Sequence, residues 1–363
     1  MSFSALAFLI SLLVNLAIIR ATPEDGRLRT DPHPTKPQRF HSHAVPRIGG
    51  VGIFVAVCGG AGTAAWSRYE TAQPLLLLVA CALPAFFCGL IEDVTHNVSP
   101  RRRLFFTTVS AALAAGLLDA VLVQTDIPGI DLLIRWFPFA LALTLFTVTG
   151  VSNSINIIDG FNGLASMCVL IIASTIAYVA FQVGDATTLF GSLIVAGAVL
   201  GFFVWNFPAG LIFLGDGGAY LLGFLVAELG VLLIRNREVS PLFPLLLCGY
   251  PIFETVFTMY RRRVVRGVQT AAPDGIHLHT LIHRRLVRGG GSRNSHERRQ
   301  IMRNSMTSPY LWLVCLTSAV PSLLWWDNSA VLGAFIVLFM VLYVLLYRSI
   351  VRFRTPKWLL LRR

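Results

Sequence analysis

The sequence contains few charged residues for its length. Of its 363 residues only 13% are charged and 55% are hydrophobic, whereas an average soluble domain is about 25% charged. This scarcity excludes an intrinsically disordered protein, a coiled coil and an ordinary soluble enzyme. Acidic residues are scarcer than basic ones, with 18 Asp and Glu against 30 Lys and Arg. In a membrane protein such an excess faces the cytoplasm and anionic lipid, so we expect no nucleic-acid partner.

Cysteine motifs and phosphate-loop motifs are also lacking. The six cysteines are spaced as single residues within apolar segments, which is typical of small buried side chains rather than of a metal site. The chain has no G-x-x-x-x-G-K-[ST] phosphate loop and no H-E-x-x-H zinc motif. Its apolar runs are continuous rather than alternating, which excludes the pattern of a transmembrane β-barrel.

Long apolar runs dominate what is present. A membrane-crossing helix needs roughly 20 mostly apolar residues, and we predict about eleven of them in a single all-α integral membrane domain over residues 1–363. The predicted spans are 2–19, 48–66, 74–91, 104–123, 136–153, 164–182, 186–205, 218–234, 242–260, 310–326 and 330–347. The first run has no basic residue before it and no small-residue cleavage site after it, so we interpret it as a retained span.

The basic residues determine the predicted orientation. With the N-terminus on the periplasmic side, 26 of the 30 Lys and Arg residues fall in loops on the opposite side. The positive-inside rule makes that side cytoplasmic, with a cytoplasmic C-terminus and an odd number of spans. Residues 261–309 then form a cytoplasmic loop that is rich in histidine and arginine.

The same predicted side collects the residues that can carry chemistry. All eight histidines lie there, together with Glu92, Asp93, Asp159 and Asp216 at the ends of predicted spans. A transporter would place its ionisable groups near the middle of the membrane. The pattern therefore indicates a site at the membrane surface that is open to the cytosol.

Acidic residues follow two of the predicted spans in distinct motifs. Glu92 and Asp93 are adjacent, and Mg²⁺ would offset the cost of two carboxylates at a membrane boundary, although two solvated loop acids give the same pattern. Asp216 lies among three glycines, where the backbone can approach a phosphate or a metal closely. Capping of the next helix is the alternative role for Asp216.

A third motif repeats polar residues at the end of an apolar run. Asn153, Asn156 and Asp159 recur every three residues, and Asp159 with Gly160 marks a tight turn. Unpaired amides are costly inside a membrane span. We therefore interpret the two asparagines as functional.

Two basic segments complete the pattern. His277 and His279, followed by Arg284, fit contact with phosphate at least as well as zinc binding, because no cysteine is near them. Lys36 and His41 belong to a basic segment before the second predicted span that suits an anionic lipid headgroup. A generic positive-inside loop gives the same pattern in this second segment.

Together these motifs resemble the polyprenyl-phosphate N-acetylhexosamine-1-phosphate transferases, the glycosyltransferase 4 family with its WecA-like and MraY-like branches. The resemblance runs from about residue 36 to residue 285. Five motifs carry it in order: His41…Pro46…Gly49-Gly50, Glu92-Asp93 with Ser99-Pro100-Arg101, Asn153-x-x-Asn156-x-x-Asp159-Gly160, Phe213-Leu-Gly-Asp216-Gly-Gly, and Asp274-Gly-Ile-His277-x-His279. Histidines that are spaced, rather than three in a row, favour the WecA-like branch.

The resemblance implies transfer of N-acetylhexosamine 1-phosphate from a UDP-sugar to undecaprenyl phosphate, with release of UMP. It implies an active site on the cytoplasmic face of a bacterial inner membrane and a role in initiating a cell-envelope polysaccharide such as O-antigen. Mg²⁺ is the implied cofactor, with Mn²⁺ as a substitute, and a homodimer is left open. The alternatives are an MraY-like phospho-N-acetylmuramoyl-pentapeptide transferase and a non-catalytic polyprenyl-lipid transporter or binding protein.

Matching to the family's motifs also assigns expected roles to individual residues. The expected catalytic residues are Asp93, Asp159 and Glu92, and the expected metal ligands are Asp216 and Asn156. The expected substrate-binding residues are Lys36, His41, Asn153, Asn156, His277, His279 and Arg284. Two positions depart from the family's pattern, because Glu92 and Asn162 stand where aspartate is common.

Overall fold

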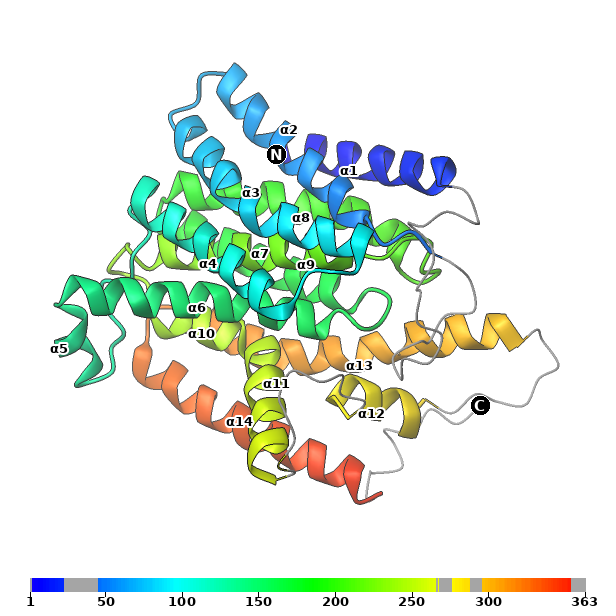
Figure 1. Cartoon of the computed structure of the whole chain (residues 1–363). Coiled ribbons are helices and arrows are strands. Elements are labelled where there is room, and N and C mark those ends of the chain that lie inside the picture. Colours follow the sequence, from blue (N-terminus) through cyan, green and yellow to red (C-terminus); the bar gives the residue numbers. More distant parts are fainter. Residues whose placement is uncertain (1, 23–44, 266, 268–275, 288–295, 354–363) are drawn as a thin grey trace.

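The chain folds into a bundle of helices. The computed structural model describes residues 2–22, 45–265, 267, 276–287 and 296–353, and no strand occurs among them. The helices are α1 (Ser2–Ala21), α2 (Gly49–Trp66), α3 (Ala72–Thr95), α4 (Pro100–Leu117), α5 (Ile130–Ile134), α6 (Phe137–Ile158), α7 (Leu164–Gln182), α8 (Ala186–Asn206), α9 (Gly215–Leu233), α10 (Leu242–Leu247), α11 (Gly249–Tyr260), the π-helix η1 (Arg261–Val265), α12 (Leu278–Arg285), α13 (His296–Leu324) and α14 (Ser329–Val351). Figure 1 shows α11 lying across the direction of α6 and α13.

Nine helices in the described part are long and apolar enough to cross a membrane. They are Phe3–Ala21, Gly49–Trp66, Ala72–Thr95, Phe137–Ile158, Leu164–Gln182, Ala186–Asn206, Gly215–Leu233, Ile301–Leu324 and Ser329–Val351. Helices suit such runs because every backbone N–H and C=O is satisfied within the segment. The all-helical membrane architecture is confirmed, whereas the count of eleven spans and the orientation of the termini stay predictions.

The two remaining predicted spans take a different form. The run at 104–123 lies largely in α4, whose first turn carries three arginines. The run at 242–260 is interrupted at Cys248, where α10 ends and α11 begins. Pro251 explains this interruption, because it has no N–H to donate to the carbonyl group of Leu247.

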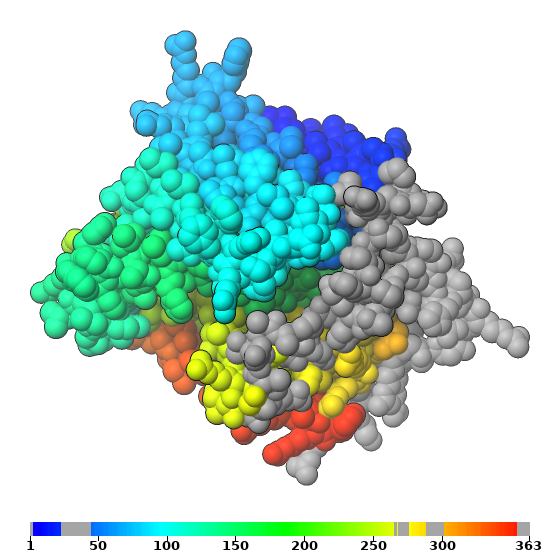
Figure 2. Space-filling model, viewed as in Figure 1, coloured from blue at the N-terminus to red at the C-terminus, as the bar shows by residue number. Residues whose placement is uncertain are grey.

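The helix α9 lies at the centre of the bundle. Over an 18-residue stretch of α9, 89% of the residues are buried, against 17% over a stretch of the same length in α14. The central helix packs against α3 and α6, which places the start of α9 beside the ends of both helices. The outer helices instead expose large apolar side chains, including Phe105 of α4, Phe146 of α6 and Val341 of α14. Figure 2 shows α4 and α6 on the face toward the viewer.

The segment 261–309 is more helical than predicted. It contains η1, the helix α12 and the first part of α13, which begins at His296 rather than near residue 310. The side chains of α12 are mostly buried, and the helix packs against α13 and α14. The apolar residues between the histidines of α12 explain this packing, and the assignment of 261–309 to a cytoplasmic loop stays a prediction.

Candidate active site

Asp93 lies in the last turn of α3 and points its carboxylate at the first turn of α9. Its side chain is 3% exposed and accepts hydrogen bonds from the backbone N–H groups of Asp216 at 2.8 Å and Gly217 at 2.9 Å. The first N–H groups of a helix have no partner within it, and the helix dipole favours a negative charge at this end. Asp93 therefore anchors α3 to α9 beside Asp216.

The turn before α9 is held by the residues that lead into α2. The N–H of Phe213 donates to the carbonyl of Pro46 at 2.8 Å. The N–H of Gly49 donates to the carbonyl of Phe213 at 3.0 Å, and the N–H of Gly50 donates to the carbonyl of Leu214 at 2.9 Å. This main-chain pairing joins two segments that lie more than 160 residues apart in the sequence.

Glycine is required where these segments meet. Gly215 has a φ angle of +75°, and a Cβ there would clash with the carbonyl oxygen of Arg47 and the carboxylate of Asp93. A Cβ on Gly50 would clash with the backbone of Gly218. Both glycines therefore allow a close approach that no other residue permits.

Asp216 connects three helices. One of its carboxylate oxygens forms an ion pair with Arg103 in the first turns of α4. The other accepts a hydrogen bond from Nδ2 of Asn156 on α6 at 3.1 Å. The Asp216 side chain keeps 15% of its surface exposed, so a substrate group can still reach it.

Asp159 follows the last residue of α6 and is half-buried. Burial raises the pKa of its carboxyl group to about 7; the nearby Arg47 opposes this rise and Asp216 adds to it. Asp159 therefore lies within electrostatic reach of Asp216, as its position at the end of a predicted span implies. We call Asp93, Asp159 and Asp216 the carboxylate cluster.

Hydrogen bonds join the turn after Asp159 to α13. The backbone N–H of Asn162 donates to Oδ1 of Asn304 at 2.8 Å. Nδ2 of Asn162 donates to the carbonyl of Pro208 at 3.1 Å, and the hydroxyl of Ser308 donates to the carbonyl of Asn162 at 2.6 Å. Asn162 is 1% exposed, so its amide serves the shape of the turn.

The histidines of α12 pack against the same turn. The ring of His279 lies edge-on to Phe161 with 5.5 Å between centroids, and it stacks on His277 at 5.0 Å. His283 places Nδ1 3.2 Å from the hydroxyl oxygen of Thr307. Burial lowers the pKa of His279 to about 3 and that of His283 to about 4, so both rings are neutral near pH 7.

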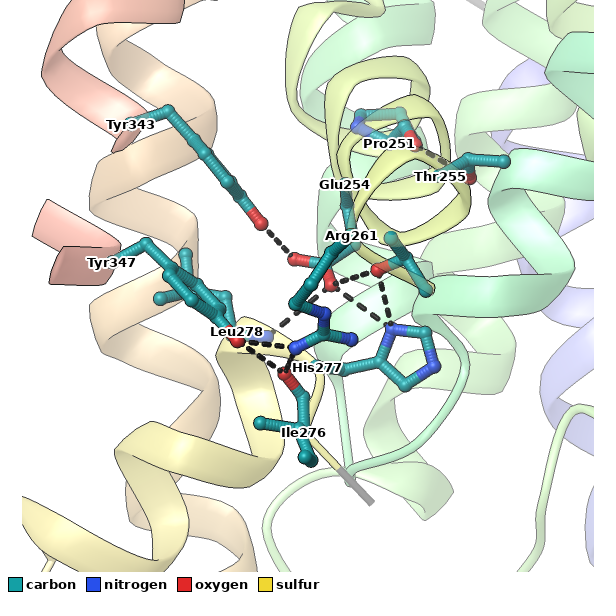
Figure 3. A network of polar contacts seen from close by, with 10 residues as sticks. Pro251, Glu254, Thr255, Arg261, Ile276, His277, Leu278, Tyr343 and Tyr347 are labelled. Carbon is teal, nitrogen blue, oxygen red and sulfur yellow. Dashed lines mark hydrogen bonds and ion pairs between the residues drawn. The ribbon is translucent and has the colours of Figure 1, made fainter. Parts of the chain in front are cut away.

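His277 is paired with a glutamate that the sequence analysis missed. Its Nδ1 lies 3.0 Å from Oε1 of Glu254 on α11 (Figure 3). Glu254 is 1% exposed and also accepts a hydrogen bond from the hydroxyl of Tyr343 on α14. A signal was available, because an ionisable residue inside a predicted span is by itself a candidate for function. We call Glu254, His277 and His279 the histidine cluster.

Comparison with known proteins identifies the chain's relatives. The family described as Glycosyl transferase family 4 matches residues 75–234. A protein of Bacillus subtilis (strain 168) named probable undecaprenyl-phosphate N-acetylglucosaminyl 1-phosphate transferase is 30% identical over 298 residues, which are 80% of this chain and 79% of the relative. The chain belongs to glycosyl transferase family 4. Proteins named undecaprenyl-phosphate alpha-N-acetylglucosaminyl 1-phosphate transferase are similar too, at 27% identity in Thermotoga maritima (69% of this chain, 72% of the relative) and 26% in Escherichia coli K12 (68% and 67%).

The matched region of this glycosyl transferase family 4 member contains the whole carboxylate cluster. It ends before α11 and α12, so the histidine cluster lies outside it. The resemblance that the motifs indicated is therefore confirmed at the level of the family. The roles of individual residues stay predictions.

The remaining predicted site residues are distributed as follows. Glu92 uses its carboxylate to accept a hydrogen bond from the backbone N–H of Val98 at 2.7 Å, which holds the loop between α3 and α4. Asn153 is half-buried on α6, one turn before Asn156, and Arg284 is exposed on α12. Two predicted residues lie outside the described part of the chain, namely Lys36 and His41.

The oxygen donors near Asp216 fit Mg²⁺. This ion is held by one or two carboxylates together with water and substrate phosphates. Asp216 supplies a carboxylate whose charge adds to the rise in the pKa of Asp159 that burial causes, and a cation at Asp216 would relieve this repulsion. Asn156 uses Nδ2 on Asp216, which leaves its Oδ1 as the atom able to face a metal.

Proposed function

We propose that this chain transfers an N-acetylhexosamine 1-phosphate from a UDP-sugar to a polyprenyl phosphate. An oxygen of the acceptor phosphate forms a bond to the β-phosphorus of the UDP-sugar. The bond between that phosphorus and the oxygen bridging to the α-phosphate breaks, and UMP leaves. The names of the relatives favour N-acetylglucosamine as the sugar and undecaprenyl phosphate as the acceptor.

One observation supports this proposal most directly. The carboxylate cluster gathers acidic side chains from the ends of α3, α6 and α9, and Arg103 adds a cation from α4. All four helix ends face one end of a bundle of membrane helices. A lipid phosphate whose tail stays in hydrocarbon can reach such a site, and so can a nucleotide from the aqueous side.

Each residue of the cluster has a proposed task. Asp159, which titrates near neutral pH, is suited to take a proton from the acceptor phosphate. Arg103 is suited to hold a diphosphate oxygen, because guanidinium groups bind phosphate through paired N–H donors. Asp93 positions Asp216 through the backbone rather than through its side chain. His279 packs on Phe161 and His277 stacks on His279, so both rings are suited to contact a substrate beside the turn that follows Asp159.

A metal ion completes the proposed chemistry. Mg²⁺ held by Asp216 and Asn156 would offset the charge of the diphosphate and of the developing leaving group. Asn156 orients Asp216 for this task by its hydrogen bond at 3.1 Å. Mn²⁺ prefers similar oxygen ligands and is the expected substitute.

The proposed orientation places the site at the cytoplasmic face of a bacterial inner membrane. The distribution of Lys and Arg supports it, since 26 of 30 lie on the side of the carboxylate cluster in the predicted topology. A reporter protein fused after Arg363 should be active only in the form that works in the cytoplasm. Activity of a reporter that works only outside the membrane would contradict this orientation.

Transfer itself is tested with purified protein in detergent. The chain should convert undecaprenyl phosphate and a labelled UDP-N-acetylhexosamine into a labelled lipid that is extracted into organic solvent. A panel of UDP-N-acetylhexosamines would identify the sugar, and labelled UMP should exchange into the UDP-sugar. A preparation that binds the lipid without exchange would support a transporter or binding protein instead. Activity only with UDP-N-acetylmuramoyl-pentapeptide would support the MraY-like alternative.

A further inference from the structure

Glu254 is a buried charge with an unusually complete set of partners. It lies in the middle of α11, in an apolar segment, and is 1% exposed. A buried carboxylate without partners is costly by several kcal/mol, so its hydrogen bonds have to be complete. The partners of Glu254 show what it does in the fold.

All of these partners donate hydrogen bonds to Glu254. Oε1 lies 3.0 Å from Nδ1 of His277 and accepts from the backbone N–H of Leu278 at 3.2 Å and the hydroxyl of Thr258 at 3.4 Å. Oε2 accepts from the hydroxyl of Tyr343. Glu254 therefore joins α11 to the start of α12 and to α14 (Figure 3).

The contact with His277 determines which ring nitrogen carries the proton. An ionised carboxylate only accepts hydrogen bonds, so Nδ1 of His277 has to be the protonated nitrogen. The tautomer of a histidine is set in this way by the partner of its other nitrogen. Figure 3 shows the second ring nitrogen of His277 on the far side of the ring from Glu254.

Ring contacts connect His277 to the turn that follows Asp159. The ring of His277 stacks on His279 with an angle of 14° between the planes, and His279 contacts Phe161 of the turn after Asp159. Glu254 is thus connected through two imidazoles and Phe161 to the turn that follows Asp159.

We propose that Glu254 is a positioning residue for the transfer reaction, which holds His277 with its proton on Nδ1 and thereby presents Nε2, as a hydrogen-bond acceptor, to a protonated oxygen of a substrate phosphate. The inference rests on the proposed function, because it needs a phosphate to be presented at the site. Glu254 does not touch the substrate and acts only through His277. A purely structural role, in which Glu254 merely ties α11, α12 and α14 together, makes different predictions.

A double-mutant cycle separates the two roles. The variants are Glu254→Gln, His277→Ala and the pair together, and kcat and KM for the UDP-sugar are measured for each. Removal of a residue that orients a functional histidine lowers activity by about 10- to 100-fold, so Glu254→Gln should lower kcat by that factor and change KM less. In the His277→Ala background the same change should lower kcat by less than about twofold, because the two residues act as one unit.

Glu228 offers a matched control. It is also a fully buried glutamate in a membrane helix, and neither of its carboxylate oxygens has a hydrogen-bond partner in the described structure. Glu228→Gln makes the same substitution at a buried glutamate on α9 that has no hydrogen-bond partner among the described residues. It should leave kcat unchanged and so show that loss of a buried carboxylate is not harmful in general.

A second comparison decides the matter if Glu254→Gln does not accumulate. Glu254→Asp keeps the charge, whereas Tyr343→Phe removes only the contact to α14 and leaves His277 paired. Tyr343→Phe should lower the thermal stability of the detergent-solubilised protein more than it lowers kcat. Glu254→Asp should lower kcat more than Tyr343→Phe does, because the shorter side chain draws the carboxylate away from Nδ1.

The outcomes are distinguishable. If Glu254→Gln lowered kcat by the same factor in the wild-type protein and in the His277→Ala variant, the positioning role would be overturned. The proposed transferase function would not be affected by that result. A loss of kcat in Tyr343→Phe as large as that in the Glu254 variants would also overturn the positioning role. A wild-type protein without transferase activity would overturn the proposed function, and this inference with it.

Discussion

The two polar clusters of this protein differ in how far their carboxylates are exposed and in how many hydrogen-bond donors surround them. In the carboxylate cluster, Asp216 keeps part of its surface exposed and Asp159 has a pKa raised to about 7. In the histidine cluster, Glu254 is fully buried and every partner donates to it. A group that exchanges protons or ligands has to stay accessible and incompletely compensated, whereas a group that orients a neighbour is most effective when it is fully satisfied.

The origins of the partners differ as well. Asp93 and Asp216 are joined by contacts at the ends of three packed helices, namely α3, α6 and α9. Glu254 instead needs α11, α12 and α14 to come together. The first cluster is therefore a direct product of the bundle, while the second depends on the segment that follows it.

Metal removal should have the largest effect, since it acts on the carboxylate cluster as a whole. EDTA should abolish formation of labelled lipid, and added Mg²⁺ or Mn²⁺ should restore it. The thermal stability of the protein should change little in the same experiment, because Arg103 already pairs with Asp216. Full turnover in EDTA would show that arginine supplies the positive charge the reaction needs.

Asp216→Asn should have the next largest effect. The variant keeps the shape of the side chain and removes its charge, so kcat/KM should fall at least about 100-fold, as when one electrostatic catalytic group is lost. Asp119→Asn is the control, because Asp119 is also paired with an arginine, Arg235, at 3.0 Å but is 80% exposed. This second change should stay within about twofold. Similar losses in both variants would contradict a site at Asp216.

The pH dependence tests the state of Asp159. Its pKa is raised above the usual value, so the carboxyl group is neutral below about pH 7 and charged above it. If the charged form accepts a proton from the substrate, kcat/KM should rise with pH through about 7. Asp159→Asn should remove this inflection and hold the rate at a low value across the range. An inflection that persists in the variant would assign it to another group.

The smallest effect is expected at Glu92. Its carboxylate accepts a hydrogen bond from the N–H of Val98, and an amide oxygen can accept the same bond. Glu92→Gln should therefore change kcat by less than about threefold, because the hydrogen bond from Val98 is kept. A loss on the scale of Asp216→Asn would restore the catalytic role that its place beside Asp93 implies.

The sequence predicts the carboxylate cluster well for a physical reason. The ends of successive spans alternate between the two membrane faces, so Asp93, Asp159 and Asp216 can be assigned to one face from the order of the spans. The contact between Asp93 and the start of α9 could not be predicted in this way. It depends on which helices are neighbours, and hydropathy carries no information about that.

The histidine cluster could not be predicted to the same extent. His277 and His279 belong to a recognisable motif, but 261–309 contains many charged residues and was expected to be a loop. Its short helix forms because apolar residues between the histidines pack on α13 and α14. Glu254 lies in an apolar run, where a single acid does little to the average hydropathy, and its partner Tyr343 is 89 positions away.

The anchor between α3 and α9 also has a genetic consequence. Asp93 takes its two hydrogen bonds from main-chain N–H groups, and every residue except proline supplies that group. A change of side chain at position 216 can therefore remove the proposed metal ligand while the donor that holds Asp93 remains. A substitution at position 216 can thus alter the proposed chemistry without breaking the contact between α3 and α9, although both depend on the same residue.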